Sequence, residues 1–307
     1  MDKIFNYINA ELVEPMNNKW LDNYNPAIGE VYSLIPDSTK EDVENAQIAA
    51  KNAFPIWSNS TIKERATVLQ RIADLQNMID NNDIKAVLCA RGGYGSVQII
   101  DNIDFSNLIK NPKWIIGYSD ITVLHSHLNI LGISTLHATM PINFSENTQR
   151  SLDSLRSVIF GMKNIIKTSP HKFNRTGKVE AEIIGGNLSI LYSLLGSKSD
   201  IYTDNKILFI EDLDEYLYHI DRMVINMKRN RKFKNLKGMI IGEMGSMNDN
   251  KISFGSNAQE IILSHIKEYD FPVCFNFPAG HLDDNRTLVF GKECTLEINE
   301  NGVILKQ

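Results

Sequence analysis

Short, continuous apolar runs recur along the chain from about residue 76, and each run ends in a polar or glycine-rich turn. KAVLCA (85–90) ends in RGGYG, and KWIIGYSD (113–120) ends in a serine and an aspartate. The next stretch, ITVLHSHLNILG, has the spacing of a helix and stops at Gly132. Strands that alternate with helices in this way predict a parallel α/β sheet, in which functional turns lie at the carboxyl ends of the strands.

The alternation continues after a polar link near residues 168–177. Its apolar runs are VEAEIIGGNLSILYSLLG, KILFIEDLDEYLYHIDRMVINMKRN, GMIIGEM and PVCFNFPAGH, followed by a closing strand pair, TLVFGKECTLEINENGVILK. We therefore expect two domains of the α/β class in this part of the chain. A parallel-sheet domain would span residues 76–165, and a second α/β domain at the carboxyl end would span residues 178–307.

The first 75 residues follow another pattern. Short strands of alternating polarity are expected around Phe5–Val13 and Val31–Ile35. Ser38 and Glu41 resemble a capping box, and the residues after them have helical spacing. A second amphipathic helix is predicted from about Ile62 to Asp80, across the boundary with the α/β sequence.

The composition is that of an ordinary globular protein, with 307 residues, 43% apolar, 22% charged and a net charge of −5. We interpret the dense basic run Lys228–Lys234 as a solvated helix end and loop, so we expect no nucleic-acid partner. No stretch of about 18 apolar residues occurs, which predicts no membrane span. The amino-terminal residues do not resemble a signal peptide.

Cysteines and histidines bear on redox state and metal binding. Cys89, Cys274 and Cys294 form no CxxC pair and are odd in number, which argues against a disulfide framework and favours the cytoplasm. Cys89 and Cys274 are expected in buried strands, as unreactive thiols.

His125 and His127 lie two apart on a predicted helix, so they face different sides and form a poor metal pair. Because the sequence also lacks a dinucleotide fingerprint, we expect no metal and no cofactor.

Ser119 lies where an apolar strand gives way to a helix. Such a turn exposes a hydroxyl and aims the next amide, that of Asp120, at the place where an oxyanion develops during acyl transfer. The sequence is G-Y-S-D rather than G-x-S-x-G, and a serine after a strand is also a common helix cap. The Gly92–Gly93 pair in RGGYG either lets a ligand approach backbone amides closely or forms a tight turn that needs positive φ.

Two further candidates stand at predicted strand ends. Glu211 ends the apolar strand KILFI, and His281 follows FPAG after the strand PVCFNF. A serine nucleophile needs a base, and the base needs an acid that fixes its tautomer, so these residue types are suitable partners. Taken singly, they are also compatible with a surface carboxylate and a polar loop residue. His137 is expected near the same site as a lining residue.

Six segments together carry a family resemblance: CARGGYG, KWIIGYSDITVLH, LHATMPINF, IIGGNLSILYSLLG, ILFIEDLDEYLYHIDRM and FPAGHLDDN. In this order they resemble the LD-carboxypeptidase family of serine peptidases, which also includes the microcin C immunity peptidases. The resemblance implies Ser119 as the nucleophile, His281 as the general base, Glu211 as the residue that orients His281, and the backbone amides of Asp120, Gly92 and Gly93 as the oxyanion hole.

The resemblance also implies a substrate and a setting. Members of this family hydrolyse the bond that precedes a terminal D-alanine in muropeptide tetrapeptides, during peptidoglycan recycling in the cytoplasm. They have a nucleophile domain and a carboxyl-terminal domain with the site between them, and homodimers are usual. An immunity-type peptidase that cleaves a peptide–nucleotide antibiotic is the alternative within the family.

Residues 1–75, from FNYINAELVEP to RIADL, instead resemble the amino-terminal segment of an aldehyde dehydrogenase. Since no dinucleotide-binding unit follows, we expect no dehydrogenase activity. The two resemblances meet near Arg71–Gln76, as at a join between two genes. The leader would then replace the first strands of the nucleophile domain. A catalytically impaired fusion product is the alternative outside the enzyme class, because strands that lose their neighbours are prone to aggregate.

Overall fold

The computed structural model describes residues 2–9, 11–24, 30–59 and 75–307. The chain divides into two compact units, Met1–Asp74 and Leu75–Gln307. Of the helix predicted from Ile62 to Asp80, the part before Leu75 lies outside the described residues. The remainder is present as α3 (Leu75–Asp80).

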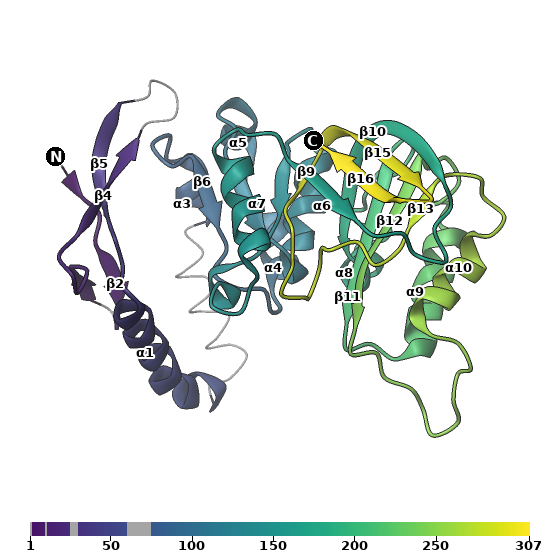
Figure 1. Cartoon of the computed structure of the whole chain (residues 1–307), viewed down its shortest axis with the longest axis horizontal. Helices are drawn as coiled ribbons and strands as arrows, with labels where there is room; N and C mark the ends of the chain where they lie inside the picture. Colours follow the sequence, from purple (N-terminus) through teal and green to yellow (C-terminus); the bar gives the residue numbers. More distant parts are fainter. Residues whose placement is uncertain (1, 10, 25–29, 60–74) are drawn as a thin grey trace. The chain divides into compact units, whose positions relative to one another are not determined.

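The described part of the first unit holds two small sheets and one long helix (Figure 1). β2 and β3 form an antiparallel hairpin, whereas β5 lies between β1, which is parallel to it, and β4, which is antiparallel. The strands predicted around Phe5–Val13 and Val31–Ile35 are thus present, and β1 and β4 are additional. The elements are β1 (Asp2–Lys3), β2 (Asn6–Ile8), β3 (Glu11–Val13), β4 (Trp20–Tyr24), β5 (Val31–Pro36) and α1 (Lys40–Asn59).

The capping box at the start of α1 lies one residue later than predicted. The Asp42 carboxylate accepts hydrogen bonds from the Thr39 amide at 2.6 Å and the Thr39 hydroxyl at 2.9 Å, and Thr39 Oγ1 accepts from the Asp42 amide at 3.3 Å. Ser38 donates instead to Asn6 Oδ1 at 2.9 Å. The assignment to Ser38 and Glu41 was wrong because the helix begins at Lys40, which leaves Thr39 at the cap and Asp42 three residues after it.

We expect the backbone amides of the first unit to exchange hydrogen early. Among the residues of this unit whose burial the structure describes, only Pro15, Ser33 and Asp42 are buried, so opening this part exposes little apolar surface and costs little free energy. Hydrogen exchange resolved by region measures this. Protection of residues 5–35 equal to that of Ile207–Ile210 would contradict the prediction and show that the first unit is integrated into the main fold.

The second unit contains two sheets, and the smaller one carries the Ser119 turn. Its strands are β6 (Ala86–Leu88), β7 (Trp114–Gly117), β8 (Thr135–His137) and β14 (Leu288–Phe290), in the order β14-β8-β7-β6. β6, β7 and β8 are parallel, as predicted. β14 comes from the closing segment of the chain and pairs with β8 in antiparallel fashion, so that segment contributes to both sheets.

Short helices lie between the parallel strands of the smaller sheet and after the last of them. They are α4 (Ser96–Ile99), α5 (Ser106–Lys110), α6 (Thr122–Ile130) and α7 (Gln149–Ile159), with 3₁₀ turns η1 (Ile100–Asn102), η2 (Ser119–Ile121) and η3 (Pro141–Asn143). The apolar residues Val123, Leu124 and Leu128 of α6 are buried in one cluster with Ile115 of β7. This packing fixes α6 directly behind the turn that joins it to β7.

The larger sheet has seven strands in the order β13-β12-β11-β10-β15-β16-β9. β10 to β13 are parallel to one another, and β15, β16 and β9 join them in antiparallel pairs. The strands are β9 (Ile165–Thr168), β10 (Gly177–Asn187), β11 (Ile207–Leu213), β12 (Gly238–Gly245), β13 (Val273–Cys274), β15 (Lys292–Asn299) and β16 (Gly302–Lys306), and the helices are α8 (Leu188–Ser193), α9 (Leu217–Arg229) and α10 (Ala258–Ile266).

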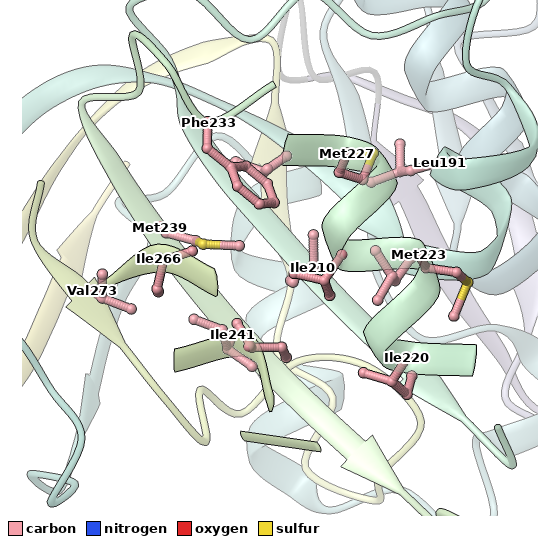
Figure 2. Packing of buried hydrophobic residues seen from close by; sticks show 14 of the residues in the cluster. Leu191, Ile210, Ile220, Met223, Met227, Phe233, Met239, Ile241, Ile266 and Val273 are labelled. Atoms are coloured by element: carbon pink, nitrogen blue, oxygen red, sulfur yellow. The ribbon is translucent and has the colours of Figure 1, made fainter. Parts of the chain in front are cut away.

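A continuous apolar core holds the helices of this part on the larger sheet (Figure 2). Ile220, Met223 and Met227 follow helical spacing along α9 and are fully buried against Ile210 of β11 and Ile241 of β12. The predicted fold class, α/β with a parallel-sheet part and a second α/β part at the carboxyl end, is confirmed. No helix within the described ranges is long and apolar enough to cross a membrane.

The cysteines agree with the prediction in one case and differ in another. Cys274 is buried in β13, as expected. Cys89 instead follows β6 and is half-buried, because β6 ends at Leu88 where the chain turns toward the glycines. Burial, with a smaller contribution from the Asp120 charge, still raises the pKa of the Cys89 thiol to about 12. Both cysteines therefore remain poor nucleophiles.

Candidate active site

Ser119 lies at the first position of η2, between the buried strand β7 and α6. Its φ of 63° is in the left-handed region, which a residue with a side chain adopts only when its surroundings hold it there. A helix cap has extended backbone angles, and the extended residue before η2 is Tyr118. The cap interpretation of Ser119 was therefore wrong, and the strained turn leaves the half-buried hydroxyl available for other contacts.

The RGGYG turn lies against this hydroxyl. A Cβ atom added at Gly92 would lie 2.9 Å from Ser119 Cβ and 3.1 Å from Ser119 Oγ, so no larger residue fits there. Within the described residues, the amides of Gly92, Gly93 and Asp120 donate no hydrogen bond. Backbone donors without partners next to a hydroxyl are suited to an oxyanion. The contribution of each amide to an oxyanion hole stays a prediction.

The Asp120 side chain has a structural role of its own. Its Oδ2 accepts hydrogen bonds from the Ser96 amide at 3.0 Å and the Ser96 hydroxyl at 2.8 Å, at the start of α4. The carboxylate thereby ties the segment after RGGYG to the serine turn. This contact keeps Gly92 next to Ser119.

Glu211 lies near the end of β11 and is fully buried. The pairing between β11 and β12 shifts at this point, so that Glu211 alone lies opposite Gly242 and Glu243. A bulge of this kind redirects the strand locally. It lets the Glu243 amide donate to Ala279 O at 3.0 Å, which brings the segment before His281 against the end of β12.

His281 and Glu211 form a close pair. His281 Nδ1 lies 2.6 Å from Glu211 Oε2, and the histidine side chain is only 16% exposed. Gly280, at φ 122°, allows this approach, because a Cβ atom there would lie 2.9 Å from the same oxygen. Burial on its own lowers the pKa of His281, but the hydrogen bond to Glu211 and the charges of Glu211 and Asp212 outweigh it and raise the pKa above its usual value.

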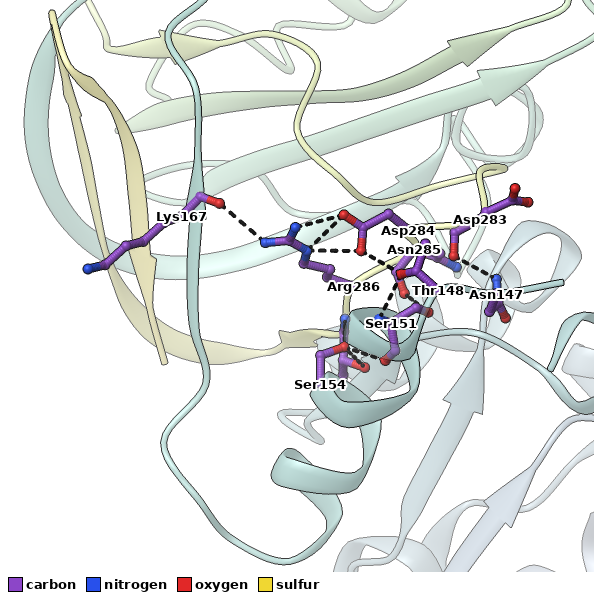
Figure 3. A network of polar contacts seen from close by, with 10 residues as sticks. Asn147, Thr148, Ser151, Ser154, Lys167, Asp283, Asp284, Asn285 and Arg286 are labelled. Atoms are coloured by element: carbon purple, nitrogen blue, oxygen red, sulfur yellow. Dashed lines mark hydrogen bonds and ion pairs between the residues drawn. The ribbon is translucent and has the colours of Figure 1, made fainter. Parts of the chain in front are cut away.

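The loop after His281 is anchored to the start of α7 by polar contacts (Figure 3). The amide of Thr148 donates to Asp283 O at 2.9 Å, and its hydroxyl donates to Asp284 Oδ1 at 2.9 Å. Ser151 Oγ donates to Asn285 O at 2.7 Å. Since Asn285 Oδ1 in turn accepts from the Gly280 amide at 3.0 Å, the backbone on both sides of His281 is fixed.

Tyr118 connects the serine turn to the histidine. It precedes Ser119, and its ring packs edge-to-face on His281 with 4.9 Å between centroids. Burial, with smaller contributions from Glu211 and Glu146, raises the pKa of Tyr118 to about 12, so it remains a neutral phenol. Its hydroxyl donates to Asn143 Oδ1 at 3.0 Å. The ring therefore sets the position of the imidazole relative to the turn.

Two further histidines near the site, His125 and His137, are fully buried. His125 is fully buried in α6, where its Nε2 lies 2.9 Å from Gly117 O. His137, expected as a lining residue, is also fully buried, and it packs on Tyr118 and Phe209. Burial lowers the pKa of both imidazoles, that of His125 to about 4. Within the described part of the chain, no group of three histidines, cysteines or carboxylates is placed to hold a metal ion.

Sequence reasoning named Ser119, Glu211 and His281 but missed the buried polar and aromatic residues around them. Tyr118 precedes Ser119, Thr122 follows it by three residues, Asp212 follows Glu211, and Asn187 ends the IIGGN segment. The available signal was the concentration of small and polar residues at the ends of apolar runs. This signal marks a site but does not say which polar residue contacts which.

An α/β fold that presents a strand-end serine and a buried histidine–glutamate pair is typical of serine hydrolases. Residues 37–138 match the family model of the LD-carboxypeptidase N-terminal domain, and residues 180–296 match that of the LD-carboxypeptidase C-terminal domain. The chain belongs to the LD-carboxypeptidase family.

Two curated relatives agree with this assignment, and a solved structure has the same fold. The chain is 32% identical over 249 residues to the "Probable murein peptide carboxypeptidase" of Bacillus subtilis strain 168, covering 77% of this chain and 76% of that protein. It is 30% identical over 244 residues to the murein tetrapeptide carboxypeptidase of Pseudomonas aeruginosa PAO1, covering 76% and 79%. The crystal structure of muramoyltetrapeptide carboxypeptidase from Oxalobacter formigenes has a TM-score of 0.70 at 24% identity, covering 76% and 80%, and shows the same fold.

One match belongs to another class of enzyme. The chain is 48% identical over 58 residues to the 2-aminomuconic semialdehyde dehydrogenase of the mouse, covering 19% of this chain and 12% of that enzyme. The match to the LD-carboxypeptidase N-terminal domain begins at residue 37, inside the segment that resembles a dehydrogenase. The origin of residues 1–75 by fusion of two genes stays a prediction.

Proposed function

We propose that this protein is a serine LD-carboxypeptidase that releases the terminal D-alanine of muropeptide tetrapeptides. The observation that carries the proposal is the 2.6 Å contact between His281 Nδ1 and buried Glu211, next to the strained Ser119 turn. Family membership supports the reaction class, and the two murein peptide carboxypeptidases support the substrate. As part of the same proposal, the enzyme acts as a homodimer in the cytoplasm, in peptidoglycan recycling.

In the proposed mechanism, Ser119 Oγ attacks the carbonyl carbon that precedes D-alanine, and His281 Nε2 takes the hydroxyl proton. The amides of Gly92, Gly93 and Asp120 stabilise the resulting oxyanion. The C–N bond then breaks, and His281 returns the proton to the amine of D-alanine. A water molecule, activated by the same histidine, hydrolyses the acyl-enzyme and regenerates Ser119.

Glu211 does not exchange a proton in this mechanism. Its hydrogen bond to Nδ1 leaves Nε2 as the nitrogen that faces the reaction, and its charge stabilises the imidazolium that forms. Because Glu211 is fully buried, water screens this interaction less than it would at the protein surface.

The proposal is tested by incubating the purified chain with a muropeptide tetrapeptide and measuring released D-alanine. The Ser119→Ala variant is the control for contaminating activity. Absence of D-alanine, together with cleavage of an aminoacyl sulfamoyl nucleotide, would favour the immunity-type alternative. Absence of both activities, in protein that gives no single cooperative melting transition, would favour the impaired fusion product.

The pH dependence of the reaction should report His281. The base works only when neutral, so kcat/KM rises as pH increases through the pKa of His281, and this acidic limb should lie above that of an ordinary histidine. Glu211→Gln removes the charge of Glu211, which raises this pKa, and leaves burial, which lowers it, together with the smaller contribution of Asp212. We therefore expect the limb to move to lower pH in this variant while the rate falls. A limb that stays in place in the pH–rate profile would contradict the pairing.

A further inference from the structure

We infer that Thr122, Asn187 and Asp212 form a hydrogen-bonded brace that sets the distance between Ser119 and the His281–Glu211 pair. The three residues are almost fully buried, at 0%, 6% and 2% exposure. The inference rests on the proposed function in one respect, because it takes Ser119 as the nucleophile. It makes Thr122 and Asp212 positioning residues rather than residues that touch substrate.

The two halves of the candidate site belong to different sheets. Ser119 follows β7 of the smaller sheet, whereas Glu211 lies on β11 of the larger sheet and His281 follows β13. The sheet hydrogen bonds within each half therefore do not fix the distance between the halves. Besides the contact of Tyr118 with His281, that distance depends on how the start of α6, three residues after Ser119, packs against the end of β10.

The brace links these points through two hydrogen bonds. Thr122 Oγ1, at the first position of α6, accepts from the amide of Asn187, the last residue of β10, at 2.9 Å. The Asn187 side chain donates through Nδ2 to Asp212 Oδ1 at 2.9 Å. Asn187 also lies directly opposite Glu211 in the β10–β11 pairing. The contacts thus connect the serine turn to Asn187, which lies opposite Glu211, and to Asp212, which follows Glu211.

Each end of the brace is held by further contacts. Asp212 Oδ2 accepts from the amide of Ser189 at 3.0 Å and from its hydroxyl at 2.7 Å. Asn187 Oδ1 accepts from the Ile190 amide at 3.2 Å, so the oxygen and the nitrogen of this side-chain amide are both hydrogen-bonded. On the other side, Gly186 leaves no free space, since a Cβ atom there would lie 2.4 Å from Thr122 Oγ1. If the start of α6 moved away from β10, these hydrogen bonds would break, and if it moved closer, it would collide with the backbone at Gly186.

Asp212 also faces the charged groups of the site. Glu211 precedes it on β11, and the charge of Asp212 acts on His281, in the loop after β13. The hydroxyl of Ser189, which contacts Asp212, also donates to Glu215, and Glu215 contacts His219 in the first turn of α9. Its carboxylate is one of the charges that raise the pKa of His281. The brace therefore fixes a charge near the imidazole as well as a distance.

The brace is tested by the rate at which Ser119 is acylated, measured with a fluorophosphonate probe. In this reaction Ser119 Oγ bonds to phosphorus, fluoride leaves, and the hydroxyl proton passes to His281 and then to solvent. Because a misplacement of about 1 Å costs about 100-fold in rate, Thr122→Val should lower the rate constant for labelling 10- to 100-fold. Probe affinity should stay within about 3-fold. Thr122→Ser, which keeps the hydroxyl, should restore the rate to within about 3-fold of wild type.

Ser126→Ala is the matched control. Ser126 is also fully buried in α6, and its hydroxyl donates to Ser199 O at 2.5 Å, one turn away from the brace. This variant should lower the melting temperature about as much as Thr122→Val while labelling at the wild-type rate. If Ser126→Ala slows labelling as much as Thr122→Val does, or if Thr122→Val labels within 3-fold of wild type, the inference is overturned.

A second variant decides the matter if Thr122→Val fails to fold. Asp212→Asn keeps the shape of the side chain but places an amide against the Ser189 donors. Labelling slowed at least 10-fold in a cooperatively melting Asp212→Asn protein supports the brace, and an unchanged rate overturns it. In the Ser119→Ala background, NMR titration should also show a lower pKa of His281 in this variant.

The same experiments separate this inference from the proposed function. A wild-type protein that is labelled at Ser119 but releases no D-alanine contradicts the proposed substrate. The labelling rates of the variants then still test whether the brace positions Ser119. A wild-type protein that is not labelled at Ser119 overturns both the nucleophile and the brace.

Discussion

Ser119→Ala is expected to lower D-alanine release by at least about three orders of magnitude, because removal of a triad nucleophile leaves only binding and oxyanion stabilisation. The change should hardly affect folding. The Ser119 hydroxyl caps no helix, and the methyl group of alanine fits the same strained turn, at φ 63°. D-alanine release and thermal melting are measured on the same preparation.

The control for this prediction is Ser96→Ala, which removes a hydroxyl that contacts Asp120 instead of the substrate. It removes one of the two hydrogen bonds to Asp120 and keeps the one from the Ser96 amide, so Gly92 stays next to Ser119 and most of the activity should remain. Ser119→Ala protein that keeps activity within a few-fold of wild type would show that another residue is the nucleophile.

His281→Ala should reduce the rate about as much as Ser119→Ala, whereas Glu211→Gln should cost roughly one to two orders of magnitude less. The histidine moves the proton, and the glutamate only orients the imidazole and stabilises its charge. At the 2.6 Å contact, glutamine keeps an acceptor oxygen but loses the negative charge. Single-turnover rates of D-alanine release measure the chemical step.

The three residues should act as a unit. In a Ser119→Ala background, neither His281→Ala nor Glu211→Gln should cause a further loss, because the step that they assist no longer occurs. Losses that add up in the double variants would assign the residues to separate features of the protein.

The sequence predicted those features that depend on short local patterns of apolar and polar residues. The parallel strands β6, β7 and β8 were predictable because each is a short apolar run that ends in a turn. Ser119 and Glu211 were recognisable as candidates because they stand at such ends. Roles for them came from the family resemblance, since a single serine after a strand is as compatible with a helix cap.

The remaining features depend on contacts between distant parts of the chain. The pairing of β14 with β8 places Leu288 opposite His137, and no local sequence pattern predicts this pairing. The burial of His137 follows from that pairing and from Phe209, which lies on the other sheet. The cap at Thr39 was missed for a local reason, because two overlapping segments have the same three-residue spacing.

The position of β14 has a consequence for synthesis on the ribosome. β7 and the Ser119 turn emerge early, but the smaller sheet gains its last strand only when residue 290 has been made. Until then the β8 edge has unpaired backbone groups, and such edges bind other extended chains. Pairings this distant in sequence also form slowly. The nascent chain therefore carries its serine turn on an open sheet until that strand is made, and we expect chaperone access during this interval to affect the yield of folded protein.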